Sequence, residues 1–278
     1  MLASDHFVRI NNLRLRYRQW GDPALPPVVL LHGGSAHAHW WDLFAAAITD
    51  SHCAYALDLR GHGDSERPNP PAYRISDYAH DLAAFIEAMG FDSVNLVGHS
   101  LGGMVATAYG AWVPERVKRL VVVDSSLRIS PAEARYMARL QRLPHPMYQS
   151  REDALRRFRL LPTHTMADPS ILRHVAAQGV RQLPDGRWTL KFDRQAMAHN
   201  ESQDLTPCLE RLRCPILFVR GAHSTVLTQA MLAALLAPFP NARAVEIPAA
   251  HHHVMLDNPP AFEREVRMFL EQPSISSA

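Results

Sequence analysis

Cysteine and lysine are scarce in this chain of 278 residues, and long apolar runs are missing. The three cysteines, Cys53, Cys208 and Cys214, are too few for a disulfide framework, and their spacing matches no zinc pattern. We therefore expect reduced thiols and no bound metal. No run approaches 18 uninterrupted apolar residues, so we expect no membrane span and no membrane partner.

A secretion signal and a strong net charge are also missing. The first residues, MLASDHFVRI, have neither the basic start nor the apolar run of a signal peptide, so we expect a cytoplasmic protein. The formal net charge is only +2, which gives no long-range field that would favour nucleic acid or anionic membranes. Hydrophobic residues make up 47% of the chain, enough for one large core.

Apolar runs and helical patterns alternate along most of the chain. FVRI and LRLRYRQW flank the turn NN, which predicts a β-hairpin. Continuous apolar segments typical of buried strands follow, namely PPVVLLHGG, AYALDL, SVNLVGHS, RLVVVD, CPILFVRG and ARAVEIP. Amphipathic helical patterns stand between or after them, for example at 227–237 and 260–271. This alternation predicts an α/β fold with a mostly parallel sheet covered by helices on both faces.

Residues 127–205 interrupt the alternation. They are polar, rich in arginine and helical in pattern, with prolines at 144, 146, 162, 169 and 184. A structureless loop of this length is improbable in a compact domain. We therefore predict a helical cap at 127–205, inserted into a core formed by 1–126 and 206–278.

The pentapeptide Gly98-His99-Ser100-Leu101-Gly102 lies between an apolar strand and a helical pattern. A serine at a sharp turn from strand to helix presents its hydroxyl above the sheet, and only very small neighbours avoid a collision there. The helix that begins at Leu101 also directs free N–H groups toward developing negative charge. Ser100 is therefore the predicted nucleophile; a serine that merely caps the helix is the alternative.

His32-Gly33-Gly34 ends an earlier buried strand. Acyl transfer creates an oxyanion that requires preorganised donors, and a glycine lets a backbone N–H approach without obstruction. We assign the N–H groups of Gly34 and Leu101 to this role; an ordinary glycine turn is the alternative.

Five nearby residues are candidates for contact with substrate. They are His37, His39, Trp40, Trp41 and Met104. Their alternatives are a solvated loop histidine and simple packing in the core.

These pieces together resemble the α/β-hydrolase superfamily over nearly the whole chain. The resemblance rests on HGG, DLRGHGDS, GHSLGG and a late histidine segment. It implies an eight-stranded core, an interposed cap, and a catalytic triad in the chain order serine, acid, histidine. We assign RGHGDS a structural role.

The predicted base comes from His251-His252-His253. Members of the superfamily usually place the histidine seven residues before a proline that opens the last helix. Counting back from Pro259 selects His252, with His251 as the alternative.

The acid departs from the commoner pattern. The loop where relatives usually carry Asp reads GAHSTVL, with Thr225 at the acidic position. Between Asp204 and Glu246 the only other carboxylate is Glu210, which precedes the strand. The resemblance offers a second place for the acid, after the sixth strand, where Asp124 closes RLVVVD. Asp124 is therefore the predicted acid; a serine–histidine dyad or an inactive site is the alternative.

The sequence thus predicts a serine hydrolase that cleaves a carboxylic ester or a related acyl bond through an acyl-enzyme, without a cofactor. Serine at the turn disfavours dehalogenase and epoxide-hydrolase chemistry, which use Asp there. Hydrolysis of a lactone or of a C–C bond is an alternative on the same fold. Two further alternatives are a cofactor-independent dioxygenase and a non-catalytic ligand receptor. The expected partner is a small acyl substrate, and the sequence indicates no oligomeric state.

Overall fold

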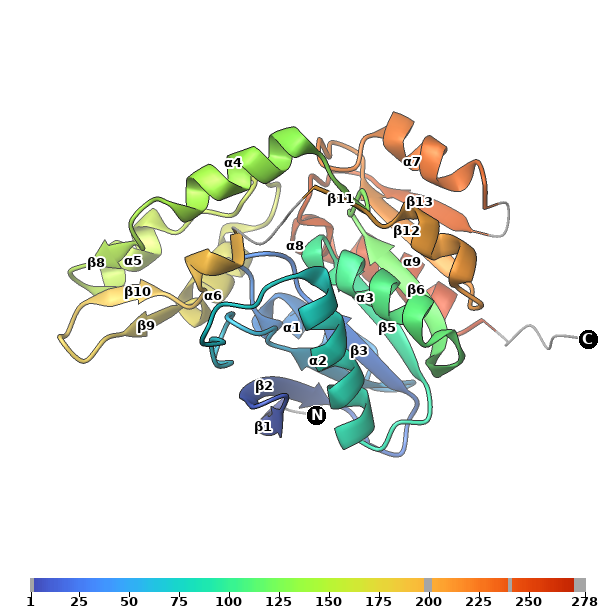
Figure 1. Cartoon of the computed structure of the whole chain (residues 1–278), viewed down its shortest axis with the longest axis horizontal. Helices are drawn as coiled ribbons and strands as arrows, with labels where there is room; N and C mark the ends of the chain where they lie inside the picture. The colour runs from blue at the N-terminus through green and yellow to red at the C-terminus, as the bar shows by residue number, and fades with distance from the viewer. Residues whose placement is uncertain (1–2, 198–201, 240–241, 273–278) are drawn as a thin grey trace, which may run out of the picture.

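The computed structural model describes residues 3–197, 202–239 and 242–272. Its centre is an eight-stranded sheet with the order β1-β2-β4-β3-β5-β6-β12-β13. The strands are β1 (Ser4–Ile10), β2 (Leu13–Trp20), β3 (Pro27–Leu31), β4 (Cys53–Leu57), β5 (Val94–His99), β6 (Val117–Val123), β12 (Ile216–Gly221) and β13 (Arg243–Ile247). β2 is antiparallel to β1 and β4, and all other pairs are parallel. The predicted α/β-hydrolase architecture is confirmed (Figure 1).

The continuous apolar strands arise because both faces of the sheet are buried. In β3, Val29 and Leu31 belong to one hydrophobic core, while Val28 and Leu30 belong to a second core on the opposite face. The first core includes residues of α2 (Ile75–Ala88), α3 (Leu101–Trp112) and α7 (Gln229–Leu236). The second core includes residues of α1 (Asp42–Ala47), α8 (Val254–Asp257) and α9 (Pro259–Leu270). A half-exposed sheet would need alternating polar residues, which these strands lack.

The helices that lie between or after the strands cover both faces of the sheet. They are α1 (Asp42–Ala47), α2 (Ile75–Ala88), α3 (Leu101–Trp112), α7 (Gln229–Leu236), α8 (Val254–Asp257) and α9 (Pro259–Leu270). Short 3₁₀ turns are η1 (Ala38–Trp41), η2 (Pro114–Arg116), η3 (Arg194–Met197) and η4 (Thr206–Arg211). The amino-terminal hairpin turns at Asn11 and Asn12, and both have the positive φ that such a turn requires. Within the described ranges, no helix has the length and apolar character needed to cross a membrane.

The inserted segment differs from the purely helical cap that its sequence predicts. Its described residues form α4 (Pro131–Gln141), α5 (Arg151–Arg157) and α6 (Pro169–Gln178), and also five short strands. Three of them, β8 (Met147–Tyr148), β10 (Trp188–Leu190) and β9 (Val180–Gln182), form a small antiparallel sheet, and β7 (Arg128–Ile129) pairs with β11 (Gln203–Asp204). Strands of two or three residues are too short to show a period-two pattern, which explains their absence from the prediction.

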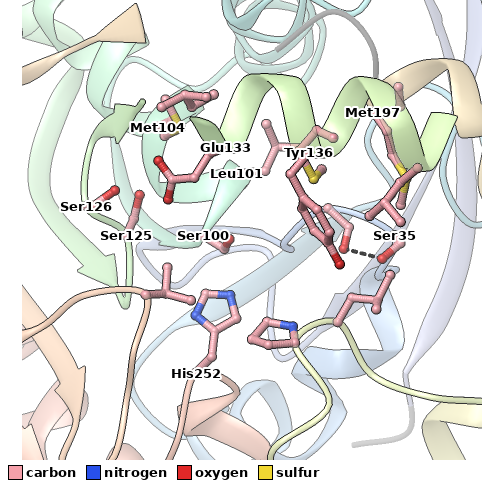
Figure 2. Close-up of a pocket in the computed structure, with 18 of the residues that line it drawn as sticks. Ser35, Ser100, Leu101, Met104, Ser125, Ser126, Glu133, Tyr136, Met197 and His252 are labelled. Carbon is pink, nitrogen blue, oxygen red and sulfur yellow. Dashed lines mark hydrogen bonds between the residues drawn. The ribbon is translucent and has the colours of Figure 1, made fainter. Parts of the chain in front are cut away.

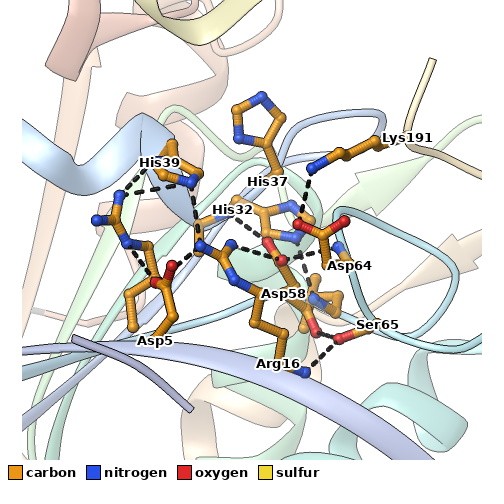
Figure 3. Close-up of polar contacts among 12 residues, drawn as sticks. Asp5, Arg16, His32, His37, His39, Asp58, Asp64, Ser65 and Lys191 are labelled. Carbon is orange, nitrogen blue, oxygen red and sulfur yellow. Dashed lines mark hydrogen bonds and ion pairs between the residues drawn. The ribbon is translucent and has the colours of Figure 1, made fainter. Parts of the chain in front are cut away.

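The RGHGDS loop holds the cap on the core. The amide of Gly63 donates to the carbonyl of Lys191, and the amide of Asp193 donates to the carbonyl of Gly61. The Lys191 ammonium also lies 2.7 Å from a carboxylate oxygen of Asp64 (Figure 3). These bonds support a structural function for this loop, which joins residues 191–193 of the cap to the core.

Asp58, at the start of this loop, is completely buried and anchors it from inside. Its carboxylate accepts from the guanidinium of Arg16 at 3.0 Å and from the amides of Ala38 and Asp64 (Figure 3). Burial alone would raise the pKa of this carboxyl, but Arg16, His32 and the two amides outweigh it and hold the pKa below its usual value. A buried carboxylate with this many donors fixes the backbone around it.

Candidate active site

Ser100 occupies the sharp turn between β5 and α3. Its backbone angles, φ 52° and ψ −115°, are ones that a residue with a side chain rarely adopts. The glycines on either side make the turn possible. A Cβ atom at Gly98 would lie 2.3 Å from the carbonyl oxygen of Gly102, and one at Gly102 would lie 2.2 Å from the carbonyl oxygen of Leu31. The predicted demand for tiny neighbours is therefore a direct consequence of backbone packing.

Asp124 and His252 are 128 positions apart in the sequence, and the fold brings them together. Asp124 follows β6 and His252 follows β13, and the His252 Nδ1 lies 2.7 Å from the Asp124 Oδ2. Both side chains are buried, Asp124 completely and His252 with 4% exposure. A carboxylate only accepts, so Nδ1 of His252 carries the hydrogen, and Nε2 of the neutral ring is left as a proton acceptor.

Two further donors hold the Asp124 carboxylate. The Gly221 amide donates to its Oδ1 at 3.1 Å, and the Ser224 hydroxyl donates to its Oδ2 at 2.6 Å. Burial raises the pKa of Asp124 to about 7, against the opposing effect of these donors and of Arg220. Burial likewise holds the pKa of His252 well below its ordinary value, and neighbouring His253 lowers it further.

Ser100 and His252 line the same cavity of about 370 Å³, which lies between the core and the cap. Most of its wall is apolar, with α4 and η3 supplying the cap side. Figure 2 shows Ser125, Ser126 and Glu133 on one side of Ser100, and Tyr136, Ser35 and Met197 on the other. The lining residues are Gly34, Ser35, His62, Ser100, Leu101, Met104, Ser125, Ser126, Arg128, Ile129, Glu133, Tyr136, Met137, Leu140, Leu161, Pro162, Phe192, Ala196, Met197, Val226 and His252.

The other residues singled out from the sequence lie in different surroundings. Gly34, Leu101 and Met104 line the cavity. Trp41 does not; it is completely buried and packs against Phe44 and Phe262 in the core.

His37 and Trp40 are also outside the lining. Nε2 of His37 donates to the carbonyl of Val175 in α6, so this buried histidine joins the core to the cap. Trp40 packs between the rings of His99 and His253. Contact of these two side chains with substrate therefore stays a prediction, which the lining of the Ser100 cavity does not support.

Sequence reasoning missed most of the cavity wall. Ser125 and Ser126 directly follow Asp124 at the same sheet edge, so their position could have been inferred from the strand order. The lining residues from α4 and η3 carry no such signal, because their placement depends on how the cap folds over the core.

In each of two clusters among the described residues, three side chains bring one potential metal-ligand atom each to within 4.8 Å of one another. One contains His99, His252 and His253, and the other contains His39, Asp42 and His174. Each of the six side chains already makes a hydrogen bond to a carboxylate, a histidine or a backbone carbonyl. We interpret both clusters as hydrogen-bonded packing and assign no metal to either.

Comparison with known proteins agrees with this architecture. A family model described as alpha/beta hydrolase fold matches residues 26–259. The chain is 27% identical to a 2-(acetamidomethylene)succinate hydrolase of Mesorhizobium japonicum, over 97% of this chain and 98% of that protein. It is 29% identical to esterase Rv0045c of Mycobacterium tuberculosis, over 91% of this chain and 85% of that protein.

A crystal structure of E-2-(acetamidomethylene)succinate hydrolase superposes with a TM-score of 0.88. The superposition covers 98% of this chain and 100% of that chain, at 24% identity. At 24% identity the similarity establishes the fold alone, and the chemistry must be argued from the residues of the site.

Proposed function

The chain belongs to the alpha/beta hydrolase fold family, and we propose that it is a serine hydrolase that cleaves a carboxylic ester or a related acyl bond. Ser100 is the nucleophile, His252 the base and Asp124 the acid. One observation carries the proposal: the His252 ring is bonded to the Asp124 carboxylate at 2.7 Å, and the same histidine faces the cavity that Ser100 lines. Hydrolases and esterases among the relatives support the reaction class.

In the first half of the reaction, Nε2 of His252 takes the Ser100 proton while the serine oxygen attacks the acyl carbon. The electron pair of the carbonyl moves to its oxygen, and the N–H groups of Gly34 and Leu101 stabilise the resulting charge. The leaving alcohol then departs with the proton from His252. Asp124 keeps the histidine in the required tautomer and stabilises its transient positive charge.

In the second half, water attacks the acyl-enzyme and gives a proton to His252. The tetrahedral intermediate collapses, the acid is released, and the proton returns to Ser100. No cofactor enters this sequence of steps.

The cavity wall favours a neutral substrate. Among the described residues that line it, Arg128 is the one arginine, and its guanidinium lies 2.7 Å from Asp204. Glu133 adds a carboxylate to the same wall. A dicarboxylate such as the succinate named for the relative would meet this negative charge without a free cation. We therefore propose a neutral, largely apolar acyl ester.

Covalent labelling tests the nucleophile. Intact-mass analysis after treatment with a fluorophosphonate should show one adduct on the wild type and none on Ser100→Ala. Absence of an adduct on folded wild-type protein would overturn the proposal. Oxygen uptake with an N-heteroaromatic substrate, or ligand binding without turnover, would instead support the dioxygenase or the receptor.

Turnover of a short p-nitrophenyl ester tests the base, and the adjacent histidine supplies a matched control. His252→Ala should lose activity, whereas His251→Ala should keep it, because the His251 ring nitrogen bonds the carbonyl of His223 and lies outside the cavity lining. The reverse result would move the base to His251. A parallel assay with an anionic succinate monoester should give the lower kcat/KM.

A further inference from the structure

Ser224 lies in the loop that follows β12, next to Thr225, which occupies the position where relatives usually carry the acid. The two neighbours face different surroundings: Thr225 is exposed, whereas Ser224 is 5% exposed. Of these two neighbours, Ser224 is the one whose side chain faces inward. It meets the Asp124 carboxylate directly, at 2.6 Å from Oδ2.

The hydrogen bonds around Ser224 fix the direction in which its hydroxyl donates. The amides of Val226 and Leu227 point at its oxygen, at 3.1 and 3.3 Å. An amide can only donate, so these two contacts use the oxygen as an acceptor. The single hydroxyl hydrogen is then directed to the remaining neighbour, the Asp124 carboxylate.

We infer that Ser224 is a positioning residue that holds Asp124 ionised and aimed at His252. This inference rests on the proposed function of the triad. The same carboxylate oxygen, Oδ2, accepts from Ser224 and from His252, so the serine fixes the atom that orients the base. The Gly221 amide holds the other oxygen, which prevents the carboxylate from rotating.

Among the described residues, the charged and titratable groups around Asp124 and His252 come from β12, from the segment after β13 and from β5, whose His99 ring lies 4.6 Å from the His252 ring. Arg220 lies in β12. Its guanidinium forms an ion pair with the Glu246 carboxylate and donates a hydrogen bond to the Leu227 carbonyl. His252 and His253 follow β13, and the pKa of each is lowered chiefly by burial. Burial raises the pKa of Asp124, and the Ser224 hydrogen bond is the largest opposing effect. Removing this donor therefore favours the protonated, inactive form of Asp124.

The test is the pH dependence of kcat/KM in Ser224→Ala. We expect the acid limb to move upward by about one pH unit, as for loss of a hydrogen bond to a charged group. Activity should fall most at pH 6 and recover toward pH 9, with KM nearly unchanged. Thr225→Ala removes the adjacent, exposed hydroxyl and should leave the profile as in the wild type. A uniform loss at every pH, or an unshifted acid limb, would overturn the inference.

Two further variants guard against failure of Ser224→Ala to fold. Ser224→Thr keeps a hydroxyl donor and should retain the wild-type acid limb, whereas Ser224→Cys offers only a weak donor and should shift it upward. An unshifted limb in the folded cysteine variant would contradict the inference as directly as the alanine result.

Proton NMR separates this inference from the proposed function. The hydrogen between His252 Nδ1 and Asp124 should give a low-field signal in the wild type, whether or not the protein hydrolyses an ester. The pH at which this signal changes should rise in Ser224→Ala and stay constant in Thr225→Ala. A protein without fluorophosphonate labelling but with this shift would refute the hydrolase and retain the positioning residue.

Discussion

Replacement of Asp124 by asparagine changes one oxygen to an NH₂ group and leaves the shape of the side chain intact. Three donors face the native carboxylate: the Gly221 amide, the Ser224 hydroxyl and His252 Nδ1. An amide offers one acceptor oxygen, so its NH₂ group must face at least one of these donors. If NH₂ faces His252, the ring accepts at Nδ1 and carries its hydrogen on Nε2, where it cannot take the Ser100 proton.

The size of the effect follows from this change of tautomer. The same substitution in a serine protease triad lowers kcat by about 10⁴, and an equal loss here is about 5 kcal/mol of transition-state stabilisation. The unmatched donor should also destabilise the fold by about 1–3 kcal/mol. We expect unchanged KM, a melting temperature lower by a few degrees, and a kcat near the limit of detection for a p-nitrophenyl ester.

Asp185→Asn is the matched control, because Asp185 is exposed and its carboxylate pairs with the nearby Arg187 side chain. It should change neither kcat nor the melting temperature. A folded Asp124→Asn protein with kcat within about tenfold of the wild type would refute Asp124 as the acid, because in either orientation the neutral amide lacks the charge that stabilises the transient imidazolium.

Three other predictions concern pH, backbone packing and the buried loop anchor. Because burial raises the pKa of Asp124 to about 7, wild-type kcat/KM should fall as the pH drops through that value, and a profile flat down to pH 5 would contradict this. Gly33→Ala should lower the melting temperature, because its Cβ would lie 2.8 Å from a His99 ring nitrogen, whereas Gly34→Ala, with no atom within 4 Å, should not. Asp58→Asn should destabilise the fold by about 3–5 kcal/mol at pH 7. Because the pKa of Asp58 is lowered, this difference should be full above its unfolded value and disappear as the pH falls through the folded one; denaturant titration at several pH values measures it.

The nucleophile turn was predictable because its requirements are local. Gly98 and Gly102 must lack side chains wherever a strand turns this sharply into a helix, and the pentapeptide displays them in sequence order. The positions of the buried strands along the chain were predictable for a similar reason: apolar runs with both faces buried differ from the patterns around them. These features depend on short stretches of chain, so one sequence suffices.

The surroundings of the triad were harder to predict because they depend on the orientation of loops. Thr225 occupies the position where relatives usually carry the acid, but its side chain is exposed. The neighbouring Ser224 faces inward and bonds Asp124. A single serine in a loop has no periodicity or motif that reveals such a contact. Trp41 illustrates the opposite case: it stands near the glycine turn in sequence, yet η1 directs its ring into the core.

The sheet and the loops contribute differently to the preorganisation of the site. The Ser100 amide donates to the carbonyl of Val123, the residue before Asp124, so the ends of β5 and β6 hold nucleophile and acid in register. His252 lies in the loop after β13, outside the strands. Its backbone is held by the His99 side chain, whose Nε2 donates to the His252 carbonyl at 2.9 Å. The base is therefore the triad member whose position depends most on side-chain contacts. The strand order fixes the positions of Ser100 and Asp124. The hydrogen bond from His99 and the hydrogen bond to Asp124 then position His252 relative to them.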